Sequence, residues 1–292
     1  MPKLKIILTI IFVTNLLGFI AVAQTPTQPS ATPGSWSQDY EPFRIAGNLY
    51  YVGTYDLASY LITTPKGNIL INTGLETSVP MIRKHIEALG FKFSDIKILL
   101  ATHAHYDHAA GLAEIKKLTG AQLMIEQEDA PVLADGGQSD FDFQGKCCTF
   151  PPVTADKLLN DKDVVKLGGM QITVLHHPGH TKGACSFLFD VKDEQRIYRI
   201  LIANMPSVLD ETNLAGMPTY PNVGKDYAYT FNAMKKLHFD IWLASHASQF
   251  NLQKKHKSGD AYNPKEFMND QQGYDAEIEE LYKAYLKKLN KN

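Results

Sequence analysis

The segment that decides the fold reads IKILLATHAHYDHAAGLAEIKKL and spans residues 96–118. Its first six residues form an apolar run that is short enough to be a buried strand, and its last ten have the apolar spacing of a helix. Three histidines and one aspartate, His103, His105, His108 and Asp107, therefore crowd a turn between a strand and a helix. Neutral imidazole and ionised carboxylate are ligands that zinc takes up, so this turn predicts a metal site.

Two further turns carry histidines at the ends of apolar runs. One reads LHHPGHTKG (residues 175–183), and the other ends the run WLASH at His246. Because open α/β sheets place ligands at strand ends, we expect His180 and His246 to join the first cluster. His176 and His177 adjoin this site, and we expect them to support it or to have structural roles.

The composition fits a globular protein without a strong surface field. The chain has 292 residues, of which 44% are hydrophobic and 21% charged, and a formal net charge of -2. The length suits one or two domains with a sizeable core. The weak charge gives no field that would favour nucleic acid or an anionic membrane, so neither is expected as a partner.

The start of the chain predicts export. Residues 1–23 have two lysines, an apolar stretch over 6–20 and an Ala-Val-Ala cleavage site before Gln24, which is typical of a secretory signal peptide. A membrane anchor is the alternative, and the shortness of the apolar stretch disfavours it. Residues 24–40 are expected to be a disordered N-terminal lead-in, and residues 41–292 the globular domain.

The three cysteines do not form a disulfide framework. Their odd number leaves at least one free or paired between chains in an exported protein. Cys147 and Cys148 are adjacent, and we expect them not to bridge each other because a disulfide needs a specific spacing of its two α-carbons. Cys185 lies in an apolar run and is expected to be buried.

The remainder alternates β-like runs with helical segments. We expect strands at 49–52, 59–63, 68–72, 96–101, 122–125, 171–176, 184–189, 198–203 and 240–245, and helices at 79–89, 109–118, 226–237 and 275–289. Residues 135–153 predict a long loop, either an apolar lid over a substrate or a packed surface loop. The order of elements predicts α/β or α+β sheets packed on each other with helices outside.

Together the motifs HxHxDH, PGHTxG and a strand-end histidine resemble the metallo-β-lactamase superfamily. The resemblance runs from about Glu41 to the C-terminus. The chain resembles the third subclass of class B, because it has His108 and no cysteine that would act as a metal ligand in the region of Cys185. The strings LIANMPS (201–207) and ASHAS (244–248) resemble the GOB-type members of that subclass. The fold implied is α/β, an αββα sandwich of two packed mixed β-sheets with helices on the outer faces.

The resemblance implies a centre with two zinc ions. The first would be bound by His103, His105 and His180, and the second by Asp107, His108 and His246. Asp107 would also orient the attacking water, and Ser207, Met205 and Asn204 would contact the substrate. The implied protein is a periplasmic, monomeric β-lactamase that opens the lactam amide of penicillins, cephalosporins and carbapenems and so confers antibiotic resistance.

Two departures from the superfamily bear on this interpretation. Many of its hydrolases place a metal-bridging Asp where this chain has Asn204, which disfavours the alternative of a lactonase or a glyoxalase-type thioesterase. Asn72 stands where an Asp usually supports a ligand histidine, so that ligand is expected to be less basic. The remaining histidines, His85, His238 and His256, are expected at the surface.

Overall fold

The computed structural model describes residues 29, 31–194 and 196–291. The predicted signal peptide, residues 1–23, lies outside the described residues. Within the described part, no helix combines the length and the apolar character needed to cross a bilayer.

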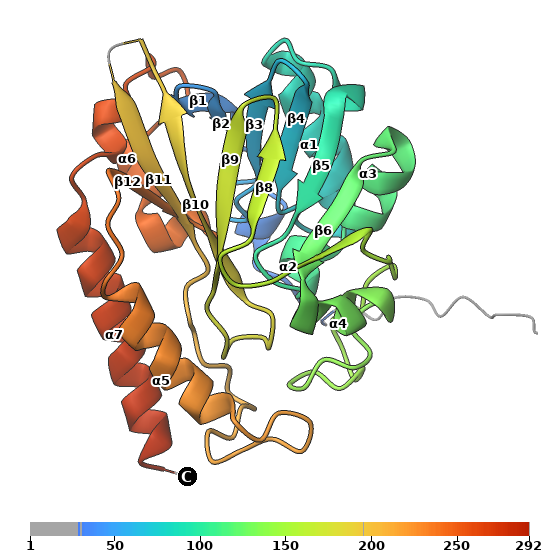
Figure 1. The fold of residues 1–292 in the computed structure, drawn as a ribbon, viewed down its shortest axis with the longest axis vertical. Coiled ribbons are helices and arrows are strands. Elements are labelled where there is room, and N and C mark those ends of the chain that lie inside the picture. Colours follow the sequence, from blue (N-terminus) through green and yellow to red (C-terminus); the bar gives the residue numbers. More distant parts are fainter. Residues whose placement is uncertain (1–28, 30, 195, 292) are drawn as a thin grey trace, which may run out of the picture.

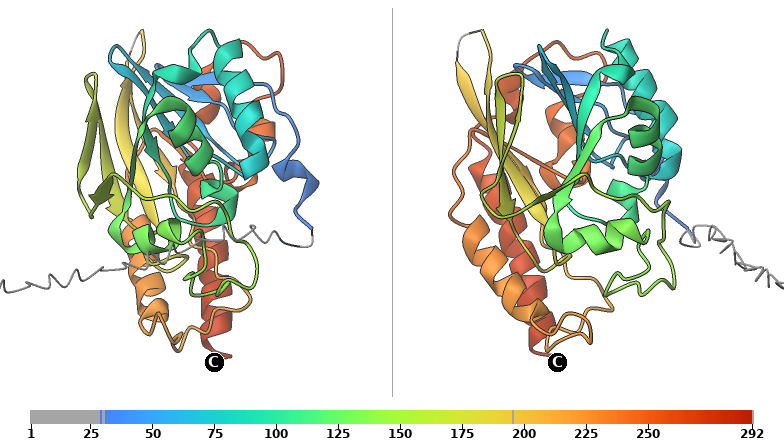
Figure 2. Two further views of the ribbon diagram at one scale, coloured as in Figure 1. Left: turned by 90° about the vertical axis from the view of Figure 1, so that its right-hand side faces the viewer. Right: turned by 45° about the vertical axis from the view of Figure 1, so that its right-hand side comes forward.

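Two mixed β-sheets pack against each other with helices outside them, which confirms the predicted fold class (Figures 1 and 2). The first sheet has the order β1 (Phe43–Ala46), β2 (Leu49–Tyr51), β3 (Tyr60–Thr64), β4 (Gly67–Ile71), β5 (Ile96–Leu100), β6 (Gln122–Glu126) and β7 (Lys157–Leu159). The second has the order β12 (Ile241–Ala244), β11 (Ile197–Ala203), β10 (Cys185–Lys192), β9 (Met170–His176) and β8 (Val164–Leu167). The neighbouring pairs β4–β5, β5–β6, β6–β7 and β11–β12 are parallel. The other neighbouring pairs are antiparallel.

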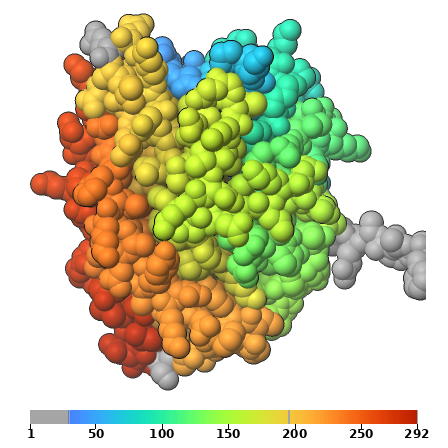
Figure 3. All heavy atoms as spheres, in the orientation of Figure 1, coloured from blue at the N-terminus to red at the C-terminus, as the bar shows by residue number. Residues whose placement is uncertain are grey.

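Helices cover both sheets. Their bounds are α1 (Val79–Ala88), α2 (Tyr106–Ala109), α3 (Leu112–Thr119), α4 (Ala130–Ala134), α5 (Val223–Met234), α6 (Leu252–Lys255) and α7 (Gln271–Leu289). Short 3₁₀ turns lie at η1 (Gly34–Trp36), η2 (Glu76–Ser78), η3 (Phe93–Asp95), η4 (Gln127–Asp129), η5 (Ala247–Phe250) and η6 (Pro264–Phe267). In the space-filling view, the segment around α5 (orange) and the C-terminal end of α7 (red) together form the lower end of the molecule (Figure 3).

The core has two layers, which explains the continuous apolar run of β5. Ile98 and Leu100 join the cluster of side chains between the sheets. Leu99 points the other way and joins a cluster that includes Ile82 of α1 and Ile115 of α3. Because both faces of the strand are covered, neither face needs polar residues.

The predicted strands are present, and the main difference in the helices lies after β5. The helix expected over 109–118 is divided into α2 and α3 at Gly111. A Cβ at Gly111 would come within 2.9 Å of the carbonyl oxygen of Thr73, so the backbone here packs directly on the end of β4. This close packing fixes the turn that carries the histidines.

Part of the predicted lead-in is folded against the domain. Trp36 donates a hydrogen bond from Nε1 to Oδ2 of Asp56 at 3.2 Å. The hydroxyl of Tyr40 donates to the carbonyl oxygen of His256 at 2.6 Å. Residues 34–40 therefore form part of the packed structure.

Two histidines expected at the surface are buried, so these predictions are wrong. His85 is 1% exposed, with Nδ1 3.0 Å from the carbonyl oxygen of Val52 and Nε2 2.7 Å from Oδ1 of Asp39. His256 is 8% exposed and stacks on Phe43 with ring centroids 3.6 Å apart. In both cases the ring is held by segments distant in the sequence, which local spacing does not reveal.

The prediction for the cysteines is wrong in one part and confirmed in another. Cys147 and Cys148 form a disulfide between adjacent residues, with Cα atoms 3.8 Å apart. The backbone of Cys148 has a φ of 65°, so the chain turns sharply where the two thiols meet. Cys185 is unpaired and buried in β10, as predicted.

Candidate metal centre

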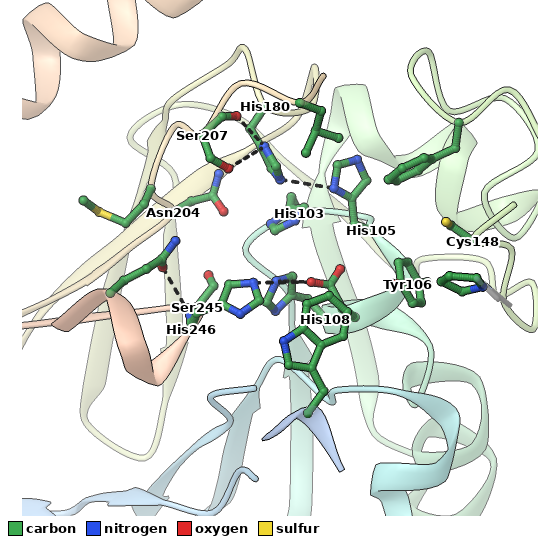
Figure 4. Close-up of a pocket in the computed structure, with 17 residues that line it drawn as sticks. His103, His105, Tyr106, His108, Cys148, His180, Asn204, Ser207, Ser245 and His246 are labelled. Carbon is green, nitrogen blue, oxygen red and sulfur yellow. Dashed lines mark hydrogen bonds and ion pairs between the residues drawn. The ribbon is translucent and has the colours of Figure 1, made fainter. Parts of the chain in front are cut away.

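All six predicted ligands lie together at one end of the two sheets (Figure 4). They line a cavity of about 270 Å³. Four of them follow β5 directly, His180 lies in the turn between β9 and β10, and His246 follows β12. The site is thus built by three segments that are far apart in the sequence and meet where the strands end.

The first group of donors consists of His103, His105 and His180, whose donor atoms lie within 4.8 Å of one another. Nδ1 of His105 lies 3.1 Å from Nε2 of His180. The other ring nitrogen of His180, Nδ1, lies 2.9 Å from the carbonyl oxygen of Ser207. His180 therefore directs Nε2 into the centre and uses Nδ1 for support.

A second group consists of His103, Asp107 and His108, with donor atoms also within 4.8 Å. His246 completes it, because its Nε2 lies 3.4 Å from Oδ2 of Asp107. On its other side, Nδ1 of His246 lies 3.2 Å from Oδ2 of Asp56. Two carboxylates thus share one imidazole, a concentration of negative charge that a cation would neutralise.

Burial and the neighbouring carboxylates act in opposite directions on the pKa values of the ligands. Burial lowers the pKa of His103, His108 and His180, the last to about 3, so these rings are neutral near pH 7. Burial would lower the pKa of His105 and His246, but Asp140 raises that of His105, and Asp107 and Asp56 raise that of His246 to about 9, so zinc would have to displace a proton from these two rings. Burial alone would raise the pKa of Asp107, but His108 and His246 hold it well below its usual range, so it is ionised. Neutral imidazole and carboxylate are the forms that bind zinc.

Unpartnered nitrogens point to the same conclusion. Nε2 of His103, Nε2 of His105 and Nδ1 of His108 are buried and have no hydrogen-bond partner among the described residues. A buried polar atom without a partner costs about 1–3 kcal/mol. A metal bound through Nε2 of His103 would satisfy that atom, so the residues present fit a metal centre.

Comparison with known proteins agrees with this geometry. The profile of the Metallo-beta-lactamase superfamily matches residues 52–193. The metallo-beta-lactamase GOB-18 from Elizabethkingia meningoseptica is 56% identical, with a TM-score of 0.90, over 92% of this chain and 100% of that chain. The class B3 di-zinc metallo-beta-lactamase LRA-12 from an Alaskan soil metagenome is 59% identical, with a TM-score of 0.88, over 90% and 99% of the two chains.

The chain belongs to the class B3 metallo-β-lactamases. More distant curated relatives include a hydroxyacylglutathione hydrolase from Bradyrhizobium sp., which is 30% identical over 46% of this chain and 44% of that relative. The chain spans about half the length of the curated relatives it matches. The resemblance to class B3 and its GOB-type members is thus confirmed.

In this class B3 member, Asn72 supports a ligand indirectly. Its Oδ1 accepts hydrogen bonds from the backbone N–H of Thr102 at 2.9 Å and from the Thr102 hydroxyl at 3.2 Å. Oγ1 of Thr102 lies in turn 3.3 Å from Nδ1 of His103. The amide therefore reaches the ligand through Thr102, with no charge passed to the imidazole.

Asp129 has a supporting role that the sequence did not indicate. It is fully buried in η4, and its Oδ2 accepts from the backbone N–H of Ala104 at 2.8 Å and from the hydroxyl of Thr181 at 2.7 Å. Its Oδ1 accepts from the backbone N–H of Gly183 at 2.7 Å. One carboxylate thus joins the HxHxDH turn to the PGHTxG turn, across separations that no local motif encodes.

The predicted substrate contacts lie at the wall of the same cavity. Asn204, Met205 and Ser207 all line it, and Ser207 Oγ lies 3.4 Å from Nδ1 of His180 (Figure 4). Trp36 and Phe143 also line the cavity with aromatic rings, and Phe143 belongs to the loop of residues 135–153 that the sequence predicts to be either a lid or a packed surface loop. The cavity therefore combines a polar floor with an apolar rim.

His176 and His177 have structural roles, which agrees with one of the two expectations for them. Nε2 of His176 lies 2.8 Å from the carbonyl oxygen of Lys182. Nδ1 of His177 lies 2.7 Å from Oγ of Ser186, a hydroxyl that also accepts from the backbone N–H of Asn204. Both rings therefore hold the turns beside the metal centre through their contacts with Lys182 and Ser186.

Proposed function

We propose that this protein is a zinc-dependent β-lactamase that hydrolyses the lactam amide of penicillins, cephalosporins and carbapenems. The observation that carries the proposal is the meeting of five buried or half-buried histidines and one aspartate at the floor of one cavity. Class B3 members at 56% and 59% identity support it. Resistance to β-lactam antibiotics would follow from this activity.

The six ligands divide into two sets. His103, His105 and His180 would hold the first zinc, and Asp107, His108 and His246 the second. Zinc in such sites supplies water with a pKa lowered to about 7 and a Lewis acid that polarises a carbonyl oxygen. The protein needs no nucleophilic serine for this chemistry.

The chain's own residues would position the reactants. The ionised carboxylate of Asp107 lies between His108 and His246, where it can accept a hydrogen bond from the attacking water and orient it. Ser207 would donate its hydroxyl to the substrate carboxylate. The buried amide of Asn204, whose Nδ2 has no hydrogen-bond partner in the described part of the chain, would offer a further donor.

The apolar rim would exclude water and hold the substrate's side groups. Trp36 lies 6.0 Å from Tyr106 and 5.6 Å from His246, measured between ring centroids. Phe143 lies 6.5 Å from Tyr106 on the other side. A fused bicyclic lactam presents both a carboxylate and apolar groups, which matches a cavity with a polar floor and an aromatic rim.

A lactonase or glyoxalase-type thioesterase is the alternative, and the distant relatedness to a hydroxyacylglutathione hydrolase is the observation in its favour. The residue pair Asn204-Met205 weighs against it, because an amide and a thioether are poor bridges between two metal ions. The lactam amide is therefore the better-supported substrate.

The test uses the purified chain without residues 1–23, with hydrolysis of a chromogenic cephalosporin and a carbapenem followed by absorbance. We expect turnover of both, loss of turnover with a chelator, recovery with zinc and about two zinc ions per chain. A glutathione thioester serves as the competing substrate. Preferential hydrolysis of the thioester, or lactam turnover that survives complete metal removal, would refute the proposal.

Export to the periplasm belongs to the same proposal. Residues 1–23 would direct secretion and be removed, and the domain of residues 41–292 would act there as a monomer. Cell fractionation with N-terminal sequencing of the mature protein tests this, and light scattering tests the oligomeric state. An intact N-terminus in the cytoplasmic fraction would contradict it.

A further inference from the structure

The loop of residues 135–153 is anchored on both sides of the cavity. On one side it packs against the segment between β11 and α5, where the Thr212 hydroxyl donates to both carboxylate oxygens of Asp142 at 3.0 Å. Phe141 meets Tyr220 of the same segment with centroids 4.9 Å apart. On the other side, Phe143 contacts the ring of His105 with centroids 5.0 Å apart.

Asp140 is the acidic residue of this loop that faces the metal centre. Its side chain is 3% exposed, and its Oδ1 accepts the backbone N–H groups of Asp142 at 2.9 Å and Phe143 at 2.8 Å. The loop itself therefore fixes the carboxylate. Its second oxygen, Oδ2, lies 3.3 Å from Nε2 of His105, which is an ion-pair distance without the geometry of a hydrogen bond.

His105 differs from its two companions in the nitrogen that it directs inward. His103 and His180 use Nδ1 for support, by Thr102 and by the carbonyl of Ser207 respectively. His105 instead places Nδ1 toward the centre, 3.1 Å from Nε2 of His180, so its support must come at Nε2. Asp140 is the carboxylate at that edge of the ring.

We propose that Asp140 is a positioning residue for the first metal site, one that keeps the proton of His105 on Nε2 and presents Nδ1 as the ligand. This rests on the proposed function only in assigning His105 to a metal. A carboxylate behind a ligand imidazole fixes the tautomer and the ring orientation. Because the same carboxylate is held by the backbone of the 135–153 loop, the loop that rims the cavity also determines the position of a ligand.

The test compares D140N with D142N. Both replace a buried aspartate of one loop with its amide, but Asp142 faces Thr212 and not a ligand. In D140N the single amide oxygen cannot face both His105 and the two backbone N–H groups. The NH₂ group therefore faces either Nε2 of His105 or the two backbone N–H groups. We expect D140N to bind the first metal about 10–100-fold more weakly in chelator competition and to change the absorption spectrum of the cobalt-substituted protein. D142N should stay within about twofold of the parent in affinity and keep the parental cobalt spectrum, since its site contacts are unchanged.

Far-UV circular dichroism establishes that both variants are folded, and D140E, which keeps the charge, should recover part of the affinity. Parental metal affinity in folded D140N, or equal losses in D140N and D142N, would overturn the proposal. Should D140N not fold, ¹⁵N spectra of histidine-labelled, zinc-loaded parent decide: a proton on Nδ1 of His105 overturns the proposal, and one on Nε2 supports it. None of these measurements uses a lactam, so failure of lactam turnover would refute the proposed function and leave this test intact.

Discussion

Replacing Asp129 should weaken the junction between the two ligand turns. Its carboxylate accepts three hydrogen bonds, from Ala104, Thr181 and Gly183, in a fully buried position. In Asp129→Asn, the amide oxygen can keep two of these donors, and the NH₂ group then faces the third, an N–H. In Asp129→Ala, all three donors lose their acceptor.

The magnitude follows from these bonds. A hydrogen bond to a charged group contributes about 1.5–3 kcal/mol, and a buried donor without a partner costs about 1–3 kcal/mol. The gain from removing a buried charge opposes this loss, since burial raises the pKa of Asp129. We expect the free energy of unfolding to fall by about 2 kcal/mol for Asp129→Asn and about 4 kcal/mol for Asp129→Ala.

Urea unfolding of the metal-free proteins measures the change in the free energy of unfolding directly, because metal binding then contributes nothing to it. Asp156→Asn is the matched control: Asp156 also accepts a backbone N–H, from Leu123 at 2.8 Å, but lies away from the ligand turns. We expect less than about 1 kcal/mol there, as its side chain is 40% exposed. If Asp129→Ala unfolded at the parental urea concentration, the assigned role of the carboxylate would be wrong.

Three further changes test other parts of the structure. His103→Ala removes a ligand whose Nε2 faces the centre and should lower carbapenem turnover by at least about 100-fold, whereas exposed His238→Ala should leave turnover unchanged. Asn204→Asp places a carboxylate beside the cluster and should require about tenfold more chelator for half-removal of metal; an unchanged titration would show that Asn204 does not face the site. Burial raises the pKa of Glu126 from 4.5 to about 7, so the folded state disfavours its charge, and the unfolding free energy should decline as pH rises through that interval. Glu126→Gln should remove that decline, and its stability relative to the parent should grow by about 2.5 kcal/mol between pH 5 and pH 8; a gap independent of pH would contradict the cause given.

The sequence predicts those parts of the fold and site that depend on local pattern. The run before His103 is a strand whose residues are apolar on both faces except for the exposed Lys97, and the histidines follow where it ends. The HxHxDH motif is strong because it fixes the spacing of four ligands within six residues, whereas the other two turns supply one histidine each. The convergence of the three turns in one cavity agrees with the family resemblance that the comparisons confirm.

Local sequence pattern does not predict the aspartates that support the ligand histidines and their turns. Asp56, Asp129 and Asp140 lie 190, 52 and 35 residues from the partners His246, Thr181 and His105. No periodicity or spacing marks them, since each contact depends on how the two sheets and their loops pack. The burial of His85 was missed for the same reason, whereas the bridge between the adjacent Cys147 and Cys148 was missed because it needs a sharp turn with positive φ at Cys148.

The indole of Trp36 has a practical consequence for how this protein is prepared. It bonds Asp56, the carboxylate that also supports His246, and it forms part of the aromatic wall. A shortened version starting at Glu41 would therefore lack one side of its own binding cavity while keeping every strand of the two sheets. Kinetic constants from such a trimmed protein would describe an enzyme with a more open and more hydrated cavity than that of the chain with residues 34–40 in place.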